Sequence, residues 1–146
     1  MINVRAKGAG GEREVIDALM PIVWKVKKEL GIPFEYTNPD LQRNQNQSAV
    51  GGSDITNPYK LSLEVKRQET LSVATWWQQC MRAAQAENAT PVLLYRQNGK
   101  KWRCVLFAEL PIATAPQHAA MRAIVEIDWL TFQIWFEQWV RRRMAE

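Results

Sequence analysis

The sequence contains few of the side chains on which zinc and thiol chemistry depend. It has two cysteines and one histidine in 146 residues, and no Cys or His pair has the spacing of a zinc site. Cys80 and Cys104 lie far apart in apolar segments, which is typical of buried free thiols in a reducing cytosol. His118 stands alone in a polar, Ala-rich stretch and is expected at the surface. These features argue against a zinc centre and against a Ser-His-Asp triad.

Three further absences narrow the class of protein. No Gly-x-x-x-x-Gly-Lys motif is present, so hydrolysis of nucleoside triphosphates is not indicated. The N-terminus lacks an apolar signal segment, and no apolar run approaches the length of a membrane span. No internal repeat is visible. We therefore expect a cytoplasmic protein with no membrane partner.

The composition is that of a globular, basic chain. Because 47% of the 146 residues are hydrophobic, we expect a single domain, 1–146, built around one core. The formal net charge of +4 and the isoelectric point near 9.3 favour an anionic partner without identifying it.

The most informative stretch joins Asp54 to a Glu-x-Lys sequence that begins ten residues later. Strand side chains alternate between faces, so Glu64 and Lys66 are expected on one face. The alternate residues of the same run, Leu61, Leu63 and Val65, are then expected to point into a core. A turn at 57–60 would bring Asp54 close to Glu64. Two carboxylates and an ammonium group on one surface could hold a hard divalent cation and a phosphate.

Helices are expected before and after this stretch. A glycine-rich segment at 7–14 is expected to open a helix over about 11–30, which Pro21 kinks or divides. Glu12 would lie in its first turn, as a metal ligand or simply as an acid favoured by the helix dipole. A second helix, 72–87, contains Trp76-Trp77-Gln78-Gln79. One of these glutamines could reach the carboxylates, or both could be solvated.

The remaining segments predict an α/β fold with a mixed central β-sheet flanked by helices. Besides the two motif strands, strands are expected near 34–37, 91–97, 102–107 and 123–127. Asn98-Gly99 is the strongest hairpin signal in the chain. Asp128 is expected to cap a last helix that ends near Met144.

Taken in order, these motifs resemble the PD-(D/E)XK nuclease superfamily. Within it, the chain is most similar to the small Holliday junction resolvases of archaea and bacteriophages. The resemblance covers about 5–107 and implies a restriction-endonuclease-like core. In that family a helix Glu, a strand Asp and the Glu of Glu-x-Lys surround one or two Mg²⁺ or Mn²⁺ ions. It therefore implies four metal ligands here: Glu12, Asp54, Glu64 and the backbone carbonyl of Val65.

The resemblance also implies roles for three further residues. Lys66 corresponds to the catalytic lysine of the family, and Gln79 to a glutamine of the second helix. Ser53 stands where a proline usually precedes the aspartate, and it could assist catalysis as a serine near the aspartate often does. Proline supplies no ligand atom, so this departure leaves the chemistry in place.

Basic residues near the candidate ligands are expected to contact DNA. They are Arg5, Lys7, Arg13, Arg43, Lys60 and Arg67. The Asn- and Gln-rich loop at 42–48 leads directly to Asp54 and could follow a DNA groove or backbone, or simply be mobile.

The sequence thus predicts an Mg²⁺-dependent DNA endonuclease that resolves four-way junctions in recombination or repair, in the host cytoplasm if a phage encodes it. Two alternatives stay open: a repair or restriction-type nuclease acting on duplex or flapped DNA, and a non-catalytic DNA-binding module. The aromatic helix within 123–144 carries apolar residues on more than one face. It is either deeply buried or part of a homodimer interface.

Overall fold

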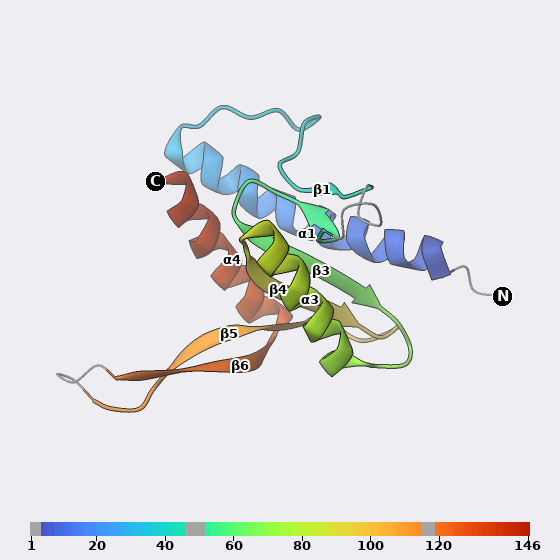
Figure 1. The fold of residues 1–146 in the computed structure, drawn as a ribbon. Coiled ribbons are helices and arrows are strands. Elements are labelled where there is room, and N and C mark those ends of the chain that lie inside the picture. The colour runs from blue at the N-terminus through green and yellow to red at the C-terminus, as the bar shows by residue number, and fades with distance from the viewer. Residues whose placement is uncertain (1–3, 46–51, 115–118) are drawn as a thin grey trace.

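The computed structural model describes residues 4–45, 52–114 and 119–146. Within these residues six strands form one mixed sheet against which three helices pack, so the α/β class expected from the sequence is confirmed (Figure 1). The elements in chain order are α1 (Val4–Leu30), β1 (Gln42–Arg43), β2 (Ile55–Thr56), β3 (Leu61–Arg67), α3 (Val73–Glu87), β4 (Thr90–Arg96), β5 (Arg103–Pro111), β6 (Ala120–Asp128) and α4 (Trp129–Met144).

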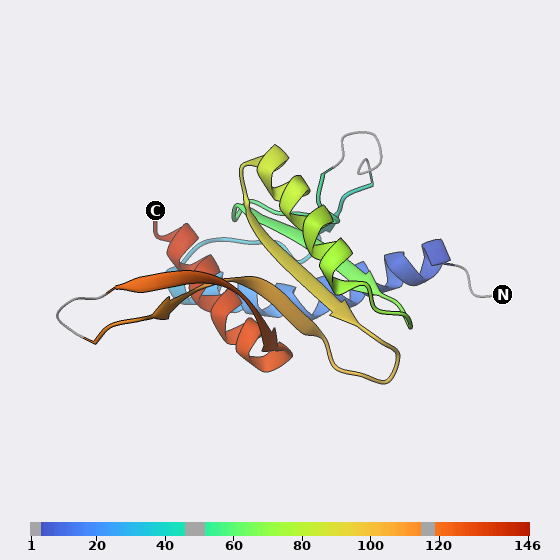
Figure 2. The ribbon, with the colours of Figure 1, turned by 60° about the horizontal axis from the view of Figure 1, so that its bottom comes forward.

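The two faces of the sheet are covered by different helices. The strands lie side by side in their chain order, and β3 and β4 run parallel whereas the other neighbouring pairs are antiparallel. A parallel pair needs a crossover connection, which α3 provides on one face. The helices α1 and α4 lie on the opposite face (Figures 1 and 2).

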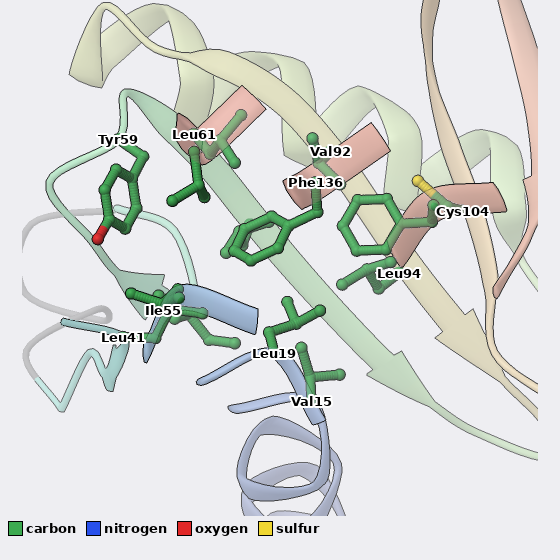
Figure 3. Packing of buried hydrophobic residues seen from close by; sticks show 14 of the residues in the cluster. Val15, Leu19, Leu41, Ile55, Tyr59, Leu61, Val92, Leu94, Cys104 and Phe136 are labelled. Atoms are coloured by element: carbon green, nitrogen blue, oxygen red, sulfur yellow. The ribbon is translucent and has the colours of Figure 1, made fainter. Parts of the chain in front are cut away.

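The larger part of the core lies between the sheet and the pair α1 and α4. Figure 3 shows Val15 and Leu19 of α1 and Phe136 of α4 meeting Leu61 and Leu94 of the sheet. A smaller cluster under α3 consists of Trp76, Trp77, Cys80, Leu93, Tyr95 and Val105. Alternate residues of β4 and β5 therefore belong to two different apolar layers.

The first helix begins earlier than the sequence suggested. It starts at Val4, so the glycine-rich segment lies inside the helix and Glu12 lies in its third turn, not its first. Of the two effects expected at Pro21, a kink or a division, the division does not occur, because one helix continues through this residue to Leu30.

Gly11 shows what the glycine-rich segment does. A Cβ atom placed there would lie 3.3 Å from Cβ of Arg67 and 3.6 Å from Cγ1 of Val65. The missing side chain therefore lets α1 approach β3 closely, and the approach brings Glu12 towards the strand that carries Glu64.

The strand expected at 34–37 does not form. The chain makes turns there, and the ring of Tyr36 packs against Trp24 of α1, with centroids 4.7 Å apart, and against Phe34 at 5.3 Å. The first strand is instead Gln42–Arg43, within the segment expected as a loop, and it pairs with β2. The apolar residues at 34–37 thus cover a helix instead of extending the sheet.

The C-terminal elements match their predictions but are longer. Gly99 adopts a φ of 74° in the turn between β4 and β5, as the Asn98-Gly99 signal predicted. Strands β5 and β6 pair over their whole length, and the ribbon they form extends beyond the helices in Figure 1. The carboxylate of Asp128 accepts a hydrogen bond from Thr131 N at 2.7 Å, which confirms the predicted cap. Among the described helices, none has the length and apolarity to cross a bilayer.

Candidate active site

A short hairpin brings Asp54 to the centre of β3. The pairing of Ile55 with Leu63 sets the register, and Asp54 N donates to Leu63 O at 3.0 Å. The Asp54 side chain then reaches past the end of β2, where its Oδ2 accepts a hydrogen bond from Val65 N at 2.7 Å. Asp54 and Glu64 are 4% and 6% exposed, so two carboxylates lie together in a nearly dry site.

The electrostatics of Glu64 reflect that site. Burial raises the pKa of Glu64 to about 8, and the charge of Asp54 and a hydrogen bond between the two carboxyl groups act in the same direction. The charge of Lys66 opposes the rise and that of Glu12 adds to it. Without a cation, protonation of Glu64 therefore relieves the repulsion between the two carboxylates.

Glu12 approaches the pair from α1. Burial raises the pKa of the Glu12 carboxyl, a hydrogen bond from Arg43 lowers it, and the charge of Asp54 raises it. Arg43 Nε lies 2.8 Å from Glu12 Oε2 in an ion pair that joins β1 to α1. The third predicted ligand is thus within electrostatic reach of Asp54, but it is held by an arginine.

The residues fit a hard divalent cation as a two-carboxylate site. No group of three Asp, Glu, His or Cys side chains within the described ranges is arranged as a metal cluster. Asp54 and Glu64 nevertheless offer buried, mutually repelling carboxylates, the donor type that Mg²⁺ prefers when it keeps several waters. In a strand the N–H and C=O of one residue point to the same side, so the carbonyl of Val65 faces the side on which its N–H meets Asp54.

The remaining predicted catalytic residues lie on β3, on α3 and just before β2. Lys66 is half-buried and lies on the same face of β3 as Glu64, and its charge acts on that carboxylate. Gln79 is exposed on α3, next to the buried Cys80. The hydroxyl of Ser53 donates to Glu87 Oε2 at 3.2 Å, and Ser53 N donates to the same carboxylate. Ser53 therefore ties the start of the motif to the end of α3.

The predicted DNA-contacting residues do not form one group. Arg43 pairs with Glu12, and Arg67 Nη1 lies 3.5 Å from Glu14 Oε2. Arg13 is exposed on α1. Lys60 is exposed with a φ of 60° at the turn before β3, the end of that strand farther from Lys66.

Part of the predicted surface cannot be placed. Arg5 and Lys7 belong to the first turns of α1, but their side chains lie outside the described residues. The same holds for residues 46–51 of the Asn- and Gln-rich loop and for His118.

Two acidic residues that sequence reasoning missed organise the surroundings. Glu87 holds Ser53, and Glu14 accepts hydrogen bonds from Arg96 Nη2 and from Trp102 Nε1 at 3.0 and 3.1 Å. Glu14 lies two residues from Glu12 on α1, but Glu87 carries no comparable signal, because its partner is 34 residues away.

Comparison with known proteins identifies a family and similar solved structures. A family model described as "Phage putative PDDEXK endonuclease" matches residues 3–143. No curated protein sequence matches the chain. Among solved structures, the chain is similar to Hjc of Archaeoglobus fulgidus, a Holliday junction resolvase from an archaeal hyperthermophile. The identity is 18%, the TM-score is 0.43, and the alignment covers 88% of each chain.

Proposed function

The chain belongs to this family of phage PDDEXK endonucleases, and on this premise we propose that it is an Mg²⁺-dependent DNA endonuclease that cuts four-way junctions. The nuclease resemblance drawn from the sequence is confirmed by the family match over residues 3–143. The observation that carries the proposed chemistry is the buried pair Asp54 and Glu64, with Lys66 on the same face of β3.

The proposed roles of the residues follow from their positions. Asp54, Glu64 and the carbonyl of Val65 hold the cation, for which Mn²⁺ can substitute, and Glu12 adds a direct or water-mediated contact. When bound, the cation lowers the pKa of a water and offsets charge on the phosphate. Lys66 orients the attacking water and offsets negative charge that develops in the transition state.

Two residues have supporting roles in this proposal. Gln79 contacts the substrate or the attacking water from α3. Ser53 assists by fixing Asp54, since Glu87 anchors both its N–H and its hydroxyl. The side chains of Arg5, Lys7, Arg13, Arg43, Lys60 and Arg67 are proposed to contact the DNA backbone.

A homodimer completes the proposal. Each chain carries one Asp54 and one Glu64-x-Lys66, whereas resolving a junction takes two cuts in opposed strands. Two copies related by a twofold axis, the commonest symmetry of oligomers, supply both cuts.

Only part of α4 is available for a dimer interface. Phe132, Phe136 and Val140 are buried in the core, and Trp135 packs against that core. The outward apolar residues are Leu130, 67% exposed, and Ile134, 59% exposed, one turn apart. We propose Ile134 as the centre of the interface and Leu130 as its edge, since Leu130 also lines a cleft beside the turn between β4 and β5.

One experiment separates the proposal from its alternatives. The purified protein is incubated with a labelled four-way junction and a matched linear duplex, with and without Mg²⁺. Paired cuts in the junction only, and only with Mg²⁺, support the proposal. Equal cutting of duplex or flapped DNA favours a repair or restriction-type nuclease, and metal-independent binding without cutting favours a DNA-binding module. Asp17→Asn, at an exposed position of α1, is the matched control for Asp54→Asn.

The dimer is tested separately by light scattering at micromolar concentration. Leu130→Glu combined with Ile134→Glu should give monomers that nick single strands but lose paired cutting. The control Lys28→Glu, at an exposed position of α1, should have the same dimeric mass as the wild type. A wild-type protein of monomeric mass that still makes paired cuts would rule out this dimer.

A further inference from the structure

We propose that the turn between β4 and β5 forms a second DNA-backbone contact, separate from the scissile phosphate, in which Lys100 and Lys101 bind phosphates. The inference rests on the proposed function for its ligand, DNA. Its test measures binding without cleavage, so that it can fail or succeed independently of the nuclease activity.

Two adjoining clefts surround this turn and share the same four cations. One, of about 490 Å³, is lined by Glu14, Arg96, Lys100, Lys101, Trp102, Arg103, Asp128, Trp129 and Leu130. The other, of about 300 Å³, is lined by Leu71, Tyr95, Arg96, Gln97, Lys100, Lys101 and Arg103. The first therefore has four basic and two acidic residues, and the second has four basic residues and no acidic one.

Two of the four cations already have partners within the protein. Arg96 lies 2.9 Å from Glu14 Oε1, and Arg103 lies 2.9 Å from Glu126 Oε2. Lys100 and Lys101 are exposed and take part in none of the ion pairs formed among the described residues. The two lysines are thus the charges that an external anion can reach, while the arginines hold the walls of the clefts.

The turn is held in place by the loop that follows β3. Gln97 Nε2 donates to Glu69 O at 2.7 Å, and Asn98 N donates to Glu69 Oε1 at 2.9 Å. Gln68 N donates to Arg96 O at 3.1 Å. Figure 2 shows the two loops side by side at this end of the sheet. Because the backbone is fixed before DNA arrives, little ordering cost remains beyond that of the lysine side chains.

The position of the turn links it to the catalytic residues. Strands β3 and β4 are parallel and in register, with Lys66 beside Tyr95 and Arg67 beside Arg96. Strand β5 then places Arg103 beside Tyr95. Adjacent strands lie about 4.8 Å apart, so the second cleft, which Tyr95 and Arg103 line, begins within roughly 10 Å of Lys66 across the sheet.

Charge and shape favour a phosphate backbone over other anions. A DNA strand presents one phosphate per about 3.4 Å of helix axis, so a backbone leaving the scissile position passes the turn within a few nucleotides. Two neighbouring, exposed lysines can each bind one phosphate of such a repeating backbone. A single small anion is more typically bound by a buried arginine through two parallel hydrogen bonds.

The test compares Lys100→Ala/Lys101→Ala with the wild-type protein. Binding of a labelled four-way junction is measured in EDTA at a series of salt concentrations. Loss of two phosphate contacts should weaken binding between about 10- and 100-fold near 0.1 M salt and reduce the slope of log K against log salt by about 1.8. Lys28→Ala/Arg142→Ala removes the same charge from two exposed positions on α1 and α4 and should change the slope by less than half as much.

The outcomes separate the two proposals. The contact is supported if affinity and slope fall in the first variant only, while the cleavage rate at saturating DNA and Mg²⁺ is unchanged. Equal affinity and slope in both variants and the wild type overturn the contact and leave the nuclease proposal standing. Loss of affinity and slope in the first variant, together with a wild-type protein that cuts no DNA, supports the contact and refutes the nuclease. Lys100→Glu/Lys101→Glu, with folding checked by circular dichroism, should deepen the loss, and no deepening would contradict the proposal.

Discussion

The seven residues of β3 alternate between two faces of the sheet that differ in their chemistry. On the side of α1 and α4, Leu61, Leu63 and Val65 join the apolar core. On the side of α3, Ser62, Glu64 and Lys66 alternate with them, and Ser62 and Glu64 are buried, as the three apolar residues are. Burial alone therefore does not distinguish the stabilising face from the face that carries the site.

The difference between the faces is energetic. Each buried leucine side chain contributes about 1.5–3 kcal/mol of transfer free energy. A buried carboxylate costs free energy unless it is paired or protonated, which is why the pKa of Glu64 is raised. We infer that Glu64 occupies this buried position because of its function and not because it stabilises the fold. Substitutions on one face should therefore affect activity, and substitutions on the other should affect stability.

The largest effect is expected from the carboxylates. Asp54→Asn and Glu64→Gln each remove a ligand charge while keeping the shape, so cleavage of labelled DNA should fall by about 10³-fold or more. DNA binding should persist, or tighten because repulsion of phosphate is removed. Near wild-type cleavage by either variant would show that the metal site is misplaced.

A change on the opposite face should affect stability instead. Leu63 is fully buried between Ile55 and Val92, so Leu63→Ala should lower the free energy of unfolding by about 2–5 kcal/mol. The cleavage rate of the folded fraction should change little, measured well below the melting temperature. Urea denaturation gives the free energy, and a selective loss of rate without destabilisation would contradict the division of faces.

This division is also the part of the molecule that the sequence predicted best. Period-two alternation in 61–67, the turn at 57–60 and the Asn98-Gly99 hairpin are local signals, and all three features form. The Asp128 cap is equally local. Fold class and the meeting of Asp54 with Glu64 therefore followed from short stretches of chain.

The errors concern features that depend on distant contacts. Gly11 was interpreted as opening a helix, whereas its role is to let α1 approach Arg67, 56 residues away. Phe34 and Tyr36 have strand-like composition, but the ring of Tyr36 packs on Trp24 and that of Phe34 packs on Tyr36. The pairing of Arg43 with Glu12 joins two elements whose proximity no local pattern reveals.

A smaller catalytic effect is expected from Lys66, which we propose as a positioned charge, since an ammonium group cannot act as a metal ligand. Lys66→Ala should slow cleavage by about 10²-fold while the Mg²⁺ concentration for half-maximal activity changes little. Lys28→Ala is the control, since Lys28 is exposed on α1. Full recovery of the rate in excess Mg²⁺ would assign Lys66 to metal binding instead.

The smallest expected effect is on the stability of the metal-free protein. Because the folded-state pKa of Glu64 is raised from 4.5 to about 8, its contribution to stability is fully present below pH 4.5 and is lost as the pH rises through 8. Glu64→Gln removes this loss, so in EDTA near pH 9 the variant should unfold with a free energy at least about 1 kcal/mol above wild type.

Well below pH 4.5 that difference should vanish, because the wild-type carboxyl is then protonated in both the folded and the unfolded state. Mg²⁺ should raise the melting temperature of the wild type at pH 9 and leave that of Glu64→Gln nearly unchanged, since the cation takes the place of the proton between the carboxylates. Glu109→Gln, an exposed position on β5, controls for the loss of one charge. A wild type that is as stable as Glu64→Gln near pH 9 in EDTA would mean that Glu64 is solvated in the free protein. The two faces of β3 would then differ in exposure, and not only in chemistry.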